Sequence, residues 1–237
     1  GIILTIIITG GYIIDGARRD GLIADIKKYQ VAYKTFYIKY RALPGDISNG
    51  SDYFSSEIGC SNADVNSDNT GCNGNGDLLI GRNTITAPEN LRAHHHLSAS
   101  DIIVTNTTAS INTTVNETTI NFNTPGSKYN DITTFFFASD NISANYLSLN
   151  SLLVVQPNNN NFLPIVRVED AALIDEKLDD GQPYQGSIIS YNANDDDCVE
   201  DSLVGAVLSD IVKQNSTYLF TSDTECIMRI AFEGKFN

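Results

Sequence analysis

The 237-residue chain contains no tryptophan, a single methionine, and only 15 lysines and arginines against 29 aspartates and glutamates. Its formal net charge of −14 opposes binding to nucleic acid, which depends on a positive patch. No segment matches a nucleophile elbow, a phosphate-binding loop or a dinucleotide fingerprint. We therefore predict that the chain is not an enzyme, has no catalytic residues, and does not bind nucleic acid through its acidic part.

The four cysteines lack the Cys-x-x-Cys spacing of zinc ribbons and redox motifs. They form two local pairs, Cys60 with Cys72 and Cys198 with Cys226. Three pairings are possible, and the local one is the simplest, so we expect these two disulfides. Because disulfides persist in oxidising compartments, we expect the chain to lie outside the reducing cytoplasm.

A charge-free run opens the chain but is too short to cross a bilayer. Residues 1–14 carry no charged side chain, and their apolar positions would cover every face of a helix. At about 1.5 Å per residue the run covers roughly 20 Å, whereas a bilayer core is about 30 Å thick. Such a surface is unsuited to water.

An amphipathic segment follows this run. Large apolar and aromatic residues recur at spacings of four and three, which is one face of a helix: Leu22, Ile26, Tyr29, Tyr33, Phe36 and Tyr40. Pro44 disfavours helical geometry at Leu43, and Gly45 permits the left-handed turn by which the chain leaves the helix. We predict one nearly continuous helix over residues 1–41, weakest at Gly10 and Gly11.

This segment and its stop resemble the N-terminal stem of type IV pilins and type II secretion pseudopilins. In one bacterial branch of that family the stem ends in a tyrosine followed closely by Leu-Pro-Gly-Asp, as residues 40–46 do here. Further similar segments are 23–29, 36–40, 89–93, 174–181 and the strand around Cys226. The resemblance implies an α+β, pilin-like fold. A helical stem, residues 1–41, would pack by its C-terminal half on an antiparallel β-sheet head, residues 42–237.

The beginning of the chain departs from the family pattern. The family's mature N-terminus is an apolar residue with a glutamate a few residues in, whereas Gly1 matches a glycine well inside the hydrophobic run. We therefore expect about a dozen residues before Gly1, which would lengthen the apolar part to roughly 25 residues, enough to span a membrane.

The resemblance implies a structural subunit that polymerises into an extracellular helical filament on the bacterial surface, serving adhesion, motility or another appendage role. Its partners would be other copies of itself, the inner membrane and periplasm before assembly, and the pilus or secretion assembly machinery. One alternative is a pseudopilin of a type II secretion system, and another is a membrane-tethered binding protein. The expected filament-core contacts are Ile2, Ile3, Leu4, Ile6, Ile7, Ile8, Tyr12, Ile13 and Ile14.

The charge is divided unevenly between stem and head. Residues 1–41 hold seven basic and three acidic side chains, a net +4, so the rest of the chain carries −18. We expect Arg18, Arg19, Lys27 or Lys28 to lie near acidic groups of neighbouring subunits. We also expect the core of the head to lie beyond Lys28, so that charge reversal at Arg18 and Arg19 would hinder assembly without unfolding the head.

Beyond residue 46 the sequence is rich in turn-forming residues. We expect a long loop over 47–77 and short helices over 89–103 and 169–178, the first with His95 or His96 facing inward. Alternating β-branched and aromatic residues predict strands at 105–122, 132–138, 146–155, 163–168, 187–191, 217–220 and 226–232.

Three consecutive histidines, His94, His95 and His96, attract a metal interpretation. Neighbouring residues on a helix point about 100° apart, so at most two of them could share one ion. We expect packing and surface exposure for these residues instead.

Alternating oxygen side chains resemble the first half of a calcium loop and make calcium a candidate cofactor: Asp64, Asn66, Asp68, Asn73, Asn75 and Asp77. The second triplet lacks the glycine at the sixth position, where Leu78 stands, and the closing glutamate at the twelfth, where Thr84 stands. The alternative is a loop of Asx turns that needs no ion. The acidic residues Asp179 and Asp180, with the run 195–197, form a second calcium candidate.

Overall fold

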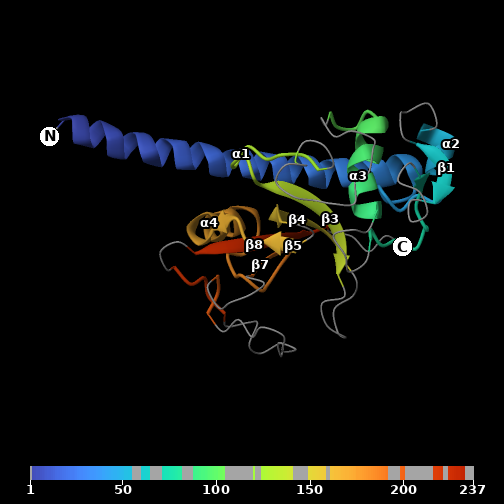
Figure 1. Ribbon diagram of the computed structural model, residues 1–237. Coiled ribbons are helices and arrows are strands. Elements are labelled where there is room, and N and C mark those ends of the chain that lie inside the picture. Colours follow the sequence, from blue (N-terminus) through green and yellow to red (C-terminus); the bar gives the residue numbers. More distant parts are fainter. Residues whose placement is uncertain are drawn as a thin grey trace.

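The computed structural model of the chain describes residues 2–54, 60–64, 71–81, 88–104, 120, 124–140, 149–158, 161–191, 198–200, 216–220 and 224–232. The helices are α1 (Ile2–Tyr40), α2 (Gly50–Phe54), α3 (Pro88–Ala99) and α4 (Val168–Leu178). The strands are β1 (Ser61–Asp64), β2 (Gly71–Asn73), β3 (Thr134–Asp140), β4 (Leu149–Asn158), β5 (Asn161–Leu163), β6 (Val166–Arg167), β7 (Ile188–Tyr191) and β8 (Glu225–Ala231). The fold is α+β, a long first helix packed on an antiparallel sheet (Figure 1).

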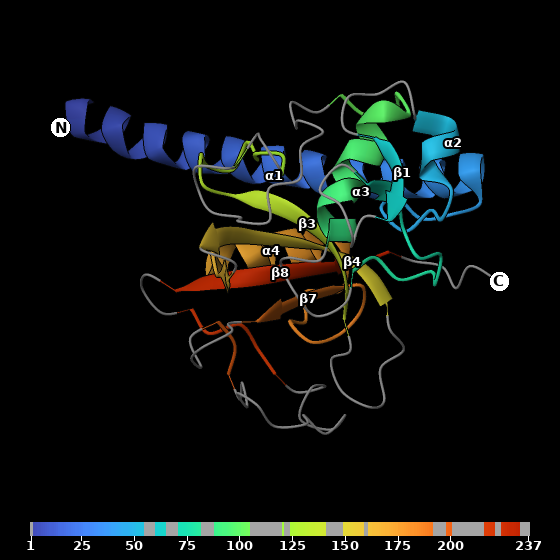
Figure 2. The same cartoon turned by 45° about the vertical axis from the view of Figure 1, so that its right-hand side comes forward.

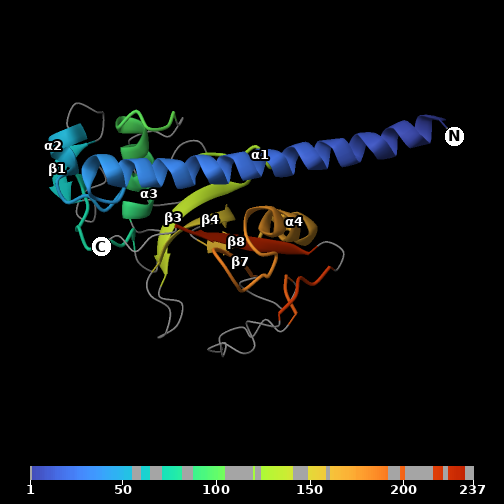
Figure 3. The same cartoon turned by 180° about the vertical axis from the view of Figure 1, so that it is seen from behind.

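The first helix, α1, is continuous over 39 residues and passes through Gly10 and Gly11 without a break. Its predicted apolar stripe is confirmed, because every member from Leu22 to Phe36 is buried and Tyr40 is half-buried. The C-terminal half of α1 lies along the head, while the N-terminal part extends beyond it (Figures 1 and 3). Within the described residues, no helix has both the length and the apolar content needed to cross a membrane.

The main sheet has six strands in the order β3-β4-β8-β6, with β5 paired to β4 and β7 paired to β8, and all of these pairs are antiparallel. Because side chains alternate along a strand, β3 serves both faces of the sheet. Phe135 and Phe137 enter the core that includes α1, whereas Phe136 and Ala138 join a smaller cluster with Leu91 of α3. The helix α3 crosses α1 near its C-terminal end (Figure 2).

The sequence predicts that the core of the head lies beyond Lys28. The main core begins earlier along α1. Leu22, Ile23 and Ile26 are already among its buried members, together with residues of β3, β4, α4 and β8. The reason is geometric: the helix lies along the sheet from its sixth turn onward, so the stripe is covered before the lysines are reached. Stem and head therefore share one core.

Most of the predicted elements are present with shifted ends. The helix expected over 89–103 ends at Ala99, since Asp101 adopts a left-handed backbone with φ of 59°. The strand expected at 163–168 is divided between β5 and β6, because Val168 already begins α4. The segment 217–220 forms a single bridge, between Tyr218 and Val199, instead of a strand. The strands expected at 105–122 fall outside the described residues except for Ile120.

The region expected to be one loop, 47–77, contains the short helix α2 and a small parallel pair, β1 with β2. The structure contains both expected disulfides, Cys60–Cys72 and Cys198–Cys226. The first connects the start of the β1 region to β2, and the second connects the segment at 198–200 to β8. All four cysteines are buried, so both disulfides lie within the core.

Candidate functional site

The projecting part of α1 is the candidate functional surface. Tyr12, Ile13 and Ile14 are 76%, 66% and 54% exposed, which is unusual for large apolar side chains. The side chains of the preceding apolar residues of α1 lie outside the described residues, although their backbone is helical. A continuous helix therefore presents unpartnered apolar side chains at the end that extends beyond the head (Figure 1).

Ion pairs between α1 and the head begin at Asp15, directly after this apolar surface. Asp15 contacts Arg167 at 3.4 Å, and Asp20 contacts Lys177 of α4 at 2.9 Å. Both of these pairs are exposed to water, so each contributes little to stability. They mark the point where the helix begins to lie on the head.

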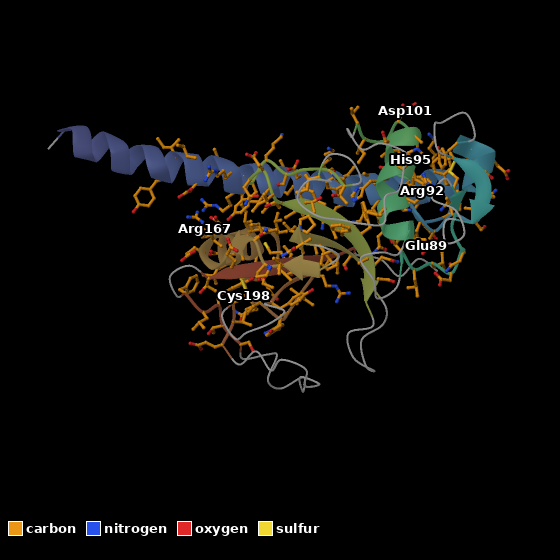
Figure 4. The ribbon with its side chains drawn as sticks, viewed as in Figure 1. Glu89, Arg92, His95, Asp101, Arg167 and Cys198 are labelled. Carbon is orange, nitrogen blue, oxygen red and sulfur yellow. A yellow bond between two sulfur atoms is a disulfide. The ribbon has the colours of Figure 1, made fainter. Side chains whose placement is uncertain are left out.

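A third contact, at Asp170 of α4, is buried. Its Oδ1 accepts a hydrogen bond from Arg19 Nη1 at 3.1 Å, and its Oδ2 accepts from the Tyr129 hydroxyl at 2.8 Å. Arg167 Nη2 and Nε donate to the same Oδ2 at 2.9 and 3.1 Å. Figure 4 places Arg167 beneath α1, beside α4. One carboxylate thus joins the first helix, α4 and the segment that carries Tyr129, and we name this group the stem clamp (Arg19, Tyr129, Arg167 and Asp170).

The stem clamp uses one of the basic residues for a contact within the chain. Arg18, Arg19, Lys27 or Lys28 was expected to lie near acidic groups of neighbouring subunits, and of these Arg19 has its guanidinium bonded to Asp170 of its own head. Arg18 lies 3.9 Å from Asp15 on the same helix. Charge reversal at Arg19 would therefore disturb the folded head, whereas Lys27 is exposed and lies outside the described ion pairs.

Aromatic stacking holds the remaining length of α1 on the head. Tyr33 stacks on Phe232 with ring centroids 4.0 Å apart and an interplanar angle of 9°. Tyr29 contacts Phe135 at 5.0 Å, and Phe36 stacks on His96 at 6.1 Å. Pairs of this kind add to the free energy of simple burial. The second half of α1 is therefore attached along its whole length.

The Leu-Pro-Gly-Asp stop is built around close backbone contacts. Gly45 has φ of 88°, and its N–H donates to His96 Nδ1 at 2.9 Å. A Cβ at this position would collide with the backbone carbonyl of Glu89. Only glycine accepts both the left-handed backbone and this contact without strain. The chain therefore turns directly under α3 when it leaves the first helix.

Two carboxylates organise the loop over residues 74–81. Asp46 is buried and accepts hydrogen bonds from the backbone N–H groups of Gly76 and Asp77 through Oδ1, and of Leu78 through Oδ2. Glu89 likewise accepts from two backbone N–H groups of this loop, at Asn75 and Gly81. Burial raises the pKa of Asp46 to about 7, and the negative charge of Glu89 adds to the rise, whereas the donated hydrogen bonds of Leu78 and Gly76 lower it.

The alternating asparagines and aspartates of this loop bind its own backbone. Asn75 Oδ1 accepts from Asp77 N–H, and Asp77 Oδ1 accepts from Leu79 N–H. These two contacts are those of Asx turns, the alternative to a calcium loop. Asn73 Oδ1 instead accepts from Ser51 N–H of α2. Asn66, Asp68 and the side chain of Asp64 lie outside the described residues.

All three histidines of α3 are buried, which corrects the expected surface exposure. Each ring has a different neighbour: His94 Nε2 lies 2.9 Å from the Phe135 carbonyl, His95 Nδ1 lies 3.0 Å from Arg92 Nη1, and His96 Nε2 lies 3.5 Å from Cys72 Sγ. Burial lowers the pKa of His94 to about 3 and that of His95 to about 4, and it lowers the pKa of His96 as well. Figure 4 shows Glu89, Arg92 and His95 along α3. Three neutral rings that face three different groups act here as packing residues.

Comparison of the chain with protein-family models, with curated proteins and with solved structures finds no match. The projecting helix, the stem clamp and the residues of the stop are the features of the molecule that bear on its function. Sequence reasoning missed the stem clamp, and the available signal was weak: an aspartate in the first turn of the helix at 169–178, which usually only stabilises a helix N-terminus.

Proposed function

We propose that the chain is a structural, pilin-like subunit that polymerises into an extracellular helical filament through its apolar N-terminal helix. The observation that carries the proposal is the exposure of Tyr12, Ile13 and Ile14 on a helix that continues, unbroken, into the core of the head. In this proposal residues 1–41 are the stem, residues 42–237 are the head, and the filament core is made by stems of several copies.

The driving force would be burial of the apolar part of the stem. Eight large aliphatic side chains lie within residues 2–14, and burying roughly 100 Å² of each at about 25 cal/mol per Å² releases on the order of 20 kcal/mol before costs. Loss of translational and rotational freedom and ordering of the interface reduce this value considerably.

The stem clamp supports a filament over a simple tether. A helix that only anchors a head to a membrane needs no rigid attachment along its second half. Here the ion pair of Arg19 with Asp170 and the ring stacking of Tyr33 on Phe232 hold the head at a defined angle to the helix. A defined angle is what helical assembly requires, because each copy must repeat the same contacts with its neighbours. A pseudopilin filament would need the same property.

Electron microscopy of the purified chain tests the proposal. The chain is purified in a mild detergent that covers the apolar stem, and we expect filaments in negative stain once the detergent is removed. The variant Ile13→Asp should form none, because it places a charge in the dry core of the filament. The matched control is Val104→Asp on the head, which is 89% exposed and far from the stem's apolar end in sequence. Filaments should persist in that variant.

A second variant tests the charges. Lys27→Glu should weaken assembly while the melting temperature of the monomer stays unchanged, because Lys27 is exposed and outside the core. A chain that remains monomeric without detergent contradicts the proposal and favours the tethered binding protein. Filaments that form equally well with Ile13→Asp also contradict it, since the stem would then not be the filament core.

A further inference from the structure

Three carboxylates converge at the C-terminal end of α4. One oxygen of each of Asp175, Asp179 and Asp180 lies within 4.8 Å of the others. Asp175 is on the last turns of α4, and the other two begin the turn that leads to β7. The partial negative charge at a helix C-terminus adds to this acidic field. Among the described ion pairs, none reaches these three residues.

The buried member of the cluster carries an independent signal. Asp175 is 0% exposed, its Oδ2 accepts from the Tyr218 hydroxyl at 2.7 Å, and its Oδ1 has no hydrogen-bond partner among the described residues. A buried carboxylate oxygen without a partner loses its hydration and gains no hydrogen bond in exchange, which costs free energy.

The turn itself is shaped around these acids. Asp179 Oδ2 accepts hydrogen bonds from the backbone N–H groups of Ser187 and Ile188. Asp180 Oδ1 accepts from Gln182 N–H at 2.8 Å. These contacts fix the two carboxyl groups without neutralising their charge. A cavity of about 570 Å³ adjoins Asp180, which lines it together with Tyr218.

We propose that Asp175, Asp179 and Asp180 bind a calcium ion. Calcium takes six to eight oxygen ligands at about 2.4 Å, so two ligand oxygens on opposite sides of the ion are about 4.8 Å apart. The spacing of the three carboxylates is therefore compatible with one shared ion, and water would complete its shell. The ion would supply a partner for the buried carboxylate and offset two of the three negative charges of the cluster.

Binding would connect three parts of the head. Asp175 belongs to α4, and Asp179 and Asp180 belong to the turn that follows it. The Tyr218 hydroxyl donates a hydrogen bond to Asp175. The next residue, Leu219, donates its N–H to the carbonyl of Cys198. Calcium would thus stabilise the head near the Cys198–Cys226 disulfide. This inference does not depend on filament formation.

Thermal unfolding of the 237-residue chain in mild detergent tests the site, with CaCl₂ compared against a chelator. We expect calcium at one hundred times its dissociation constant to raise the melting temperature by about 5 °C or more. Terbium provides a second readout, because tyrosine sensitises its luminescence and the chain has 11 tyrosines and no tryptophan. Calcium should displace the terbium signal.

Three single substitutions locate the ion. Asp180 is exposed, so we expect the Asp180→Asn variant to fold. This variant should lose both the rise in melting temperature with calcium and the terbium luminescence. Asp131→Asn makes the same charge change at an exposed position outside the cluster and should leave both unchanged. If calcium leaves the melting temperature of the unmodified chain unchanged, or acts equally on Asp180→Asn, the proposal is overturned. It is also overturned if Asp77→Asn removes the effects instead, since the ion would then occupy the loop over residues 74–81.

Discussion

Removal of the Asp170 carboxylate is the sharpest test of how the stem is attached. The residue is 1% exposed and accepts four hydrogen bonds, from Tyr129, from two nitrogens of Arg167 and from Arg19. Asp170→Ala would leave two guanidinium groups and a phenol without their acceptor. Losing one partner of a fully buried ion pair costs about 3–5 kcal/mol.

The expected cost here is smaller than for a fully buried pair. The side chains of Arg19 and Arg167 are 29% and 48% exposed, so water can replace part of what they lose. We therefore expect Asp170→Ala to lower the free energy of unfolding by about 2–3 kcal/mol. The control is Glu169→Ala, which removes a neighbouring, exposed acidic residue from the same first helical turn and should cost no more than about 0.5 kcal/mol.

Urea unfolding at neutral pH, followed by far-ultraviolet circular dichroism in mild detergent, measures both costs. The double variant of Arg19→Ala with Asp170→Ala should cost less than the sum of the two single variants by about 1 kcal/mol, because the two side chains interact directly. A cost for Asp170→Ala equal to that of Glu169→Ala would refute the stem clamp as a stabilising contact.

Three further predictions follow from the described contacts. Replacing Cys198 and Cys226 by alanine should lower the free energy of unfolding by about 3 kcal/mol, measured by urea unfolding, and non-reducing peptide mapping of the unmodified chain should find this pair uncrossed. Gly45→Ala should destabilise by more than about 2 kcal/mol because of its positive φ and the backbone carbonyl above it, whereas Gly16→Ala, with open space around it in the middle of α1, should stabilise by up to about 1 kcal/mol. Burial lowers the pKa of His95 to about 4 in the folded chain. Between about pH 6.5 and pH 4 the unfolded state therefore binds one more proton at this residue, and stability falls as the pH falls. His95→Gln should make that fall shallower by about 1.4 kcal/mol per pH unit, in urea unfolding at several pH values, and an unchanged slope would show that His95 is protonated in the folded state.

The elements with strong local signals were predictable from the sequence. The stripe from Leu22 to Phe36 follows from helical periodicity, because residues three and four apart lie on one face. The stop at Gly45 follows from the backbone preferences of proline and glycine. The short separation within each cysteine pair favoured the local disulfides. These features depend on neighbours along the chain, so a pattern of residue types can specify them.

The contacts that position the sites were decided only in three dimensions. Arg19 and Asp170 are 151 residues apart, and no local pattern identifies one as the partner of the other. The direction of His94, His95 and His96 depended on how α3 crosses α1, which placed all three rings inside. In the sequence, Asp175 is one polar residue of an amphipathic helix. Its contact with Tyr218, 43 positions later, exists only in the folded chain. Burial and pairing are properties of the packed chain, because they depend on which surfaces the helix and the sheet bring together.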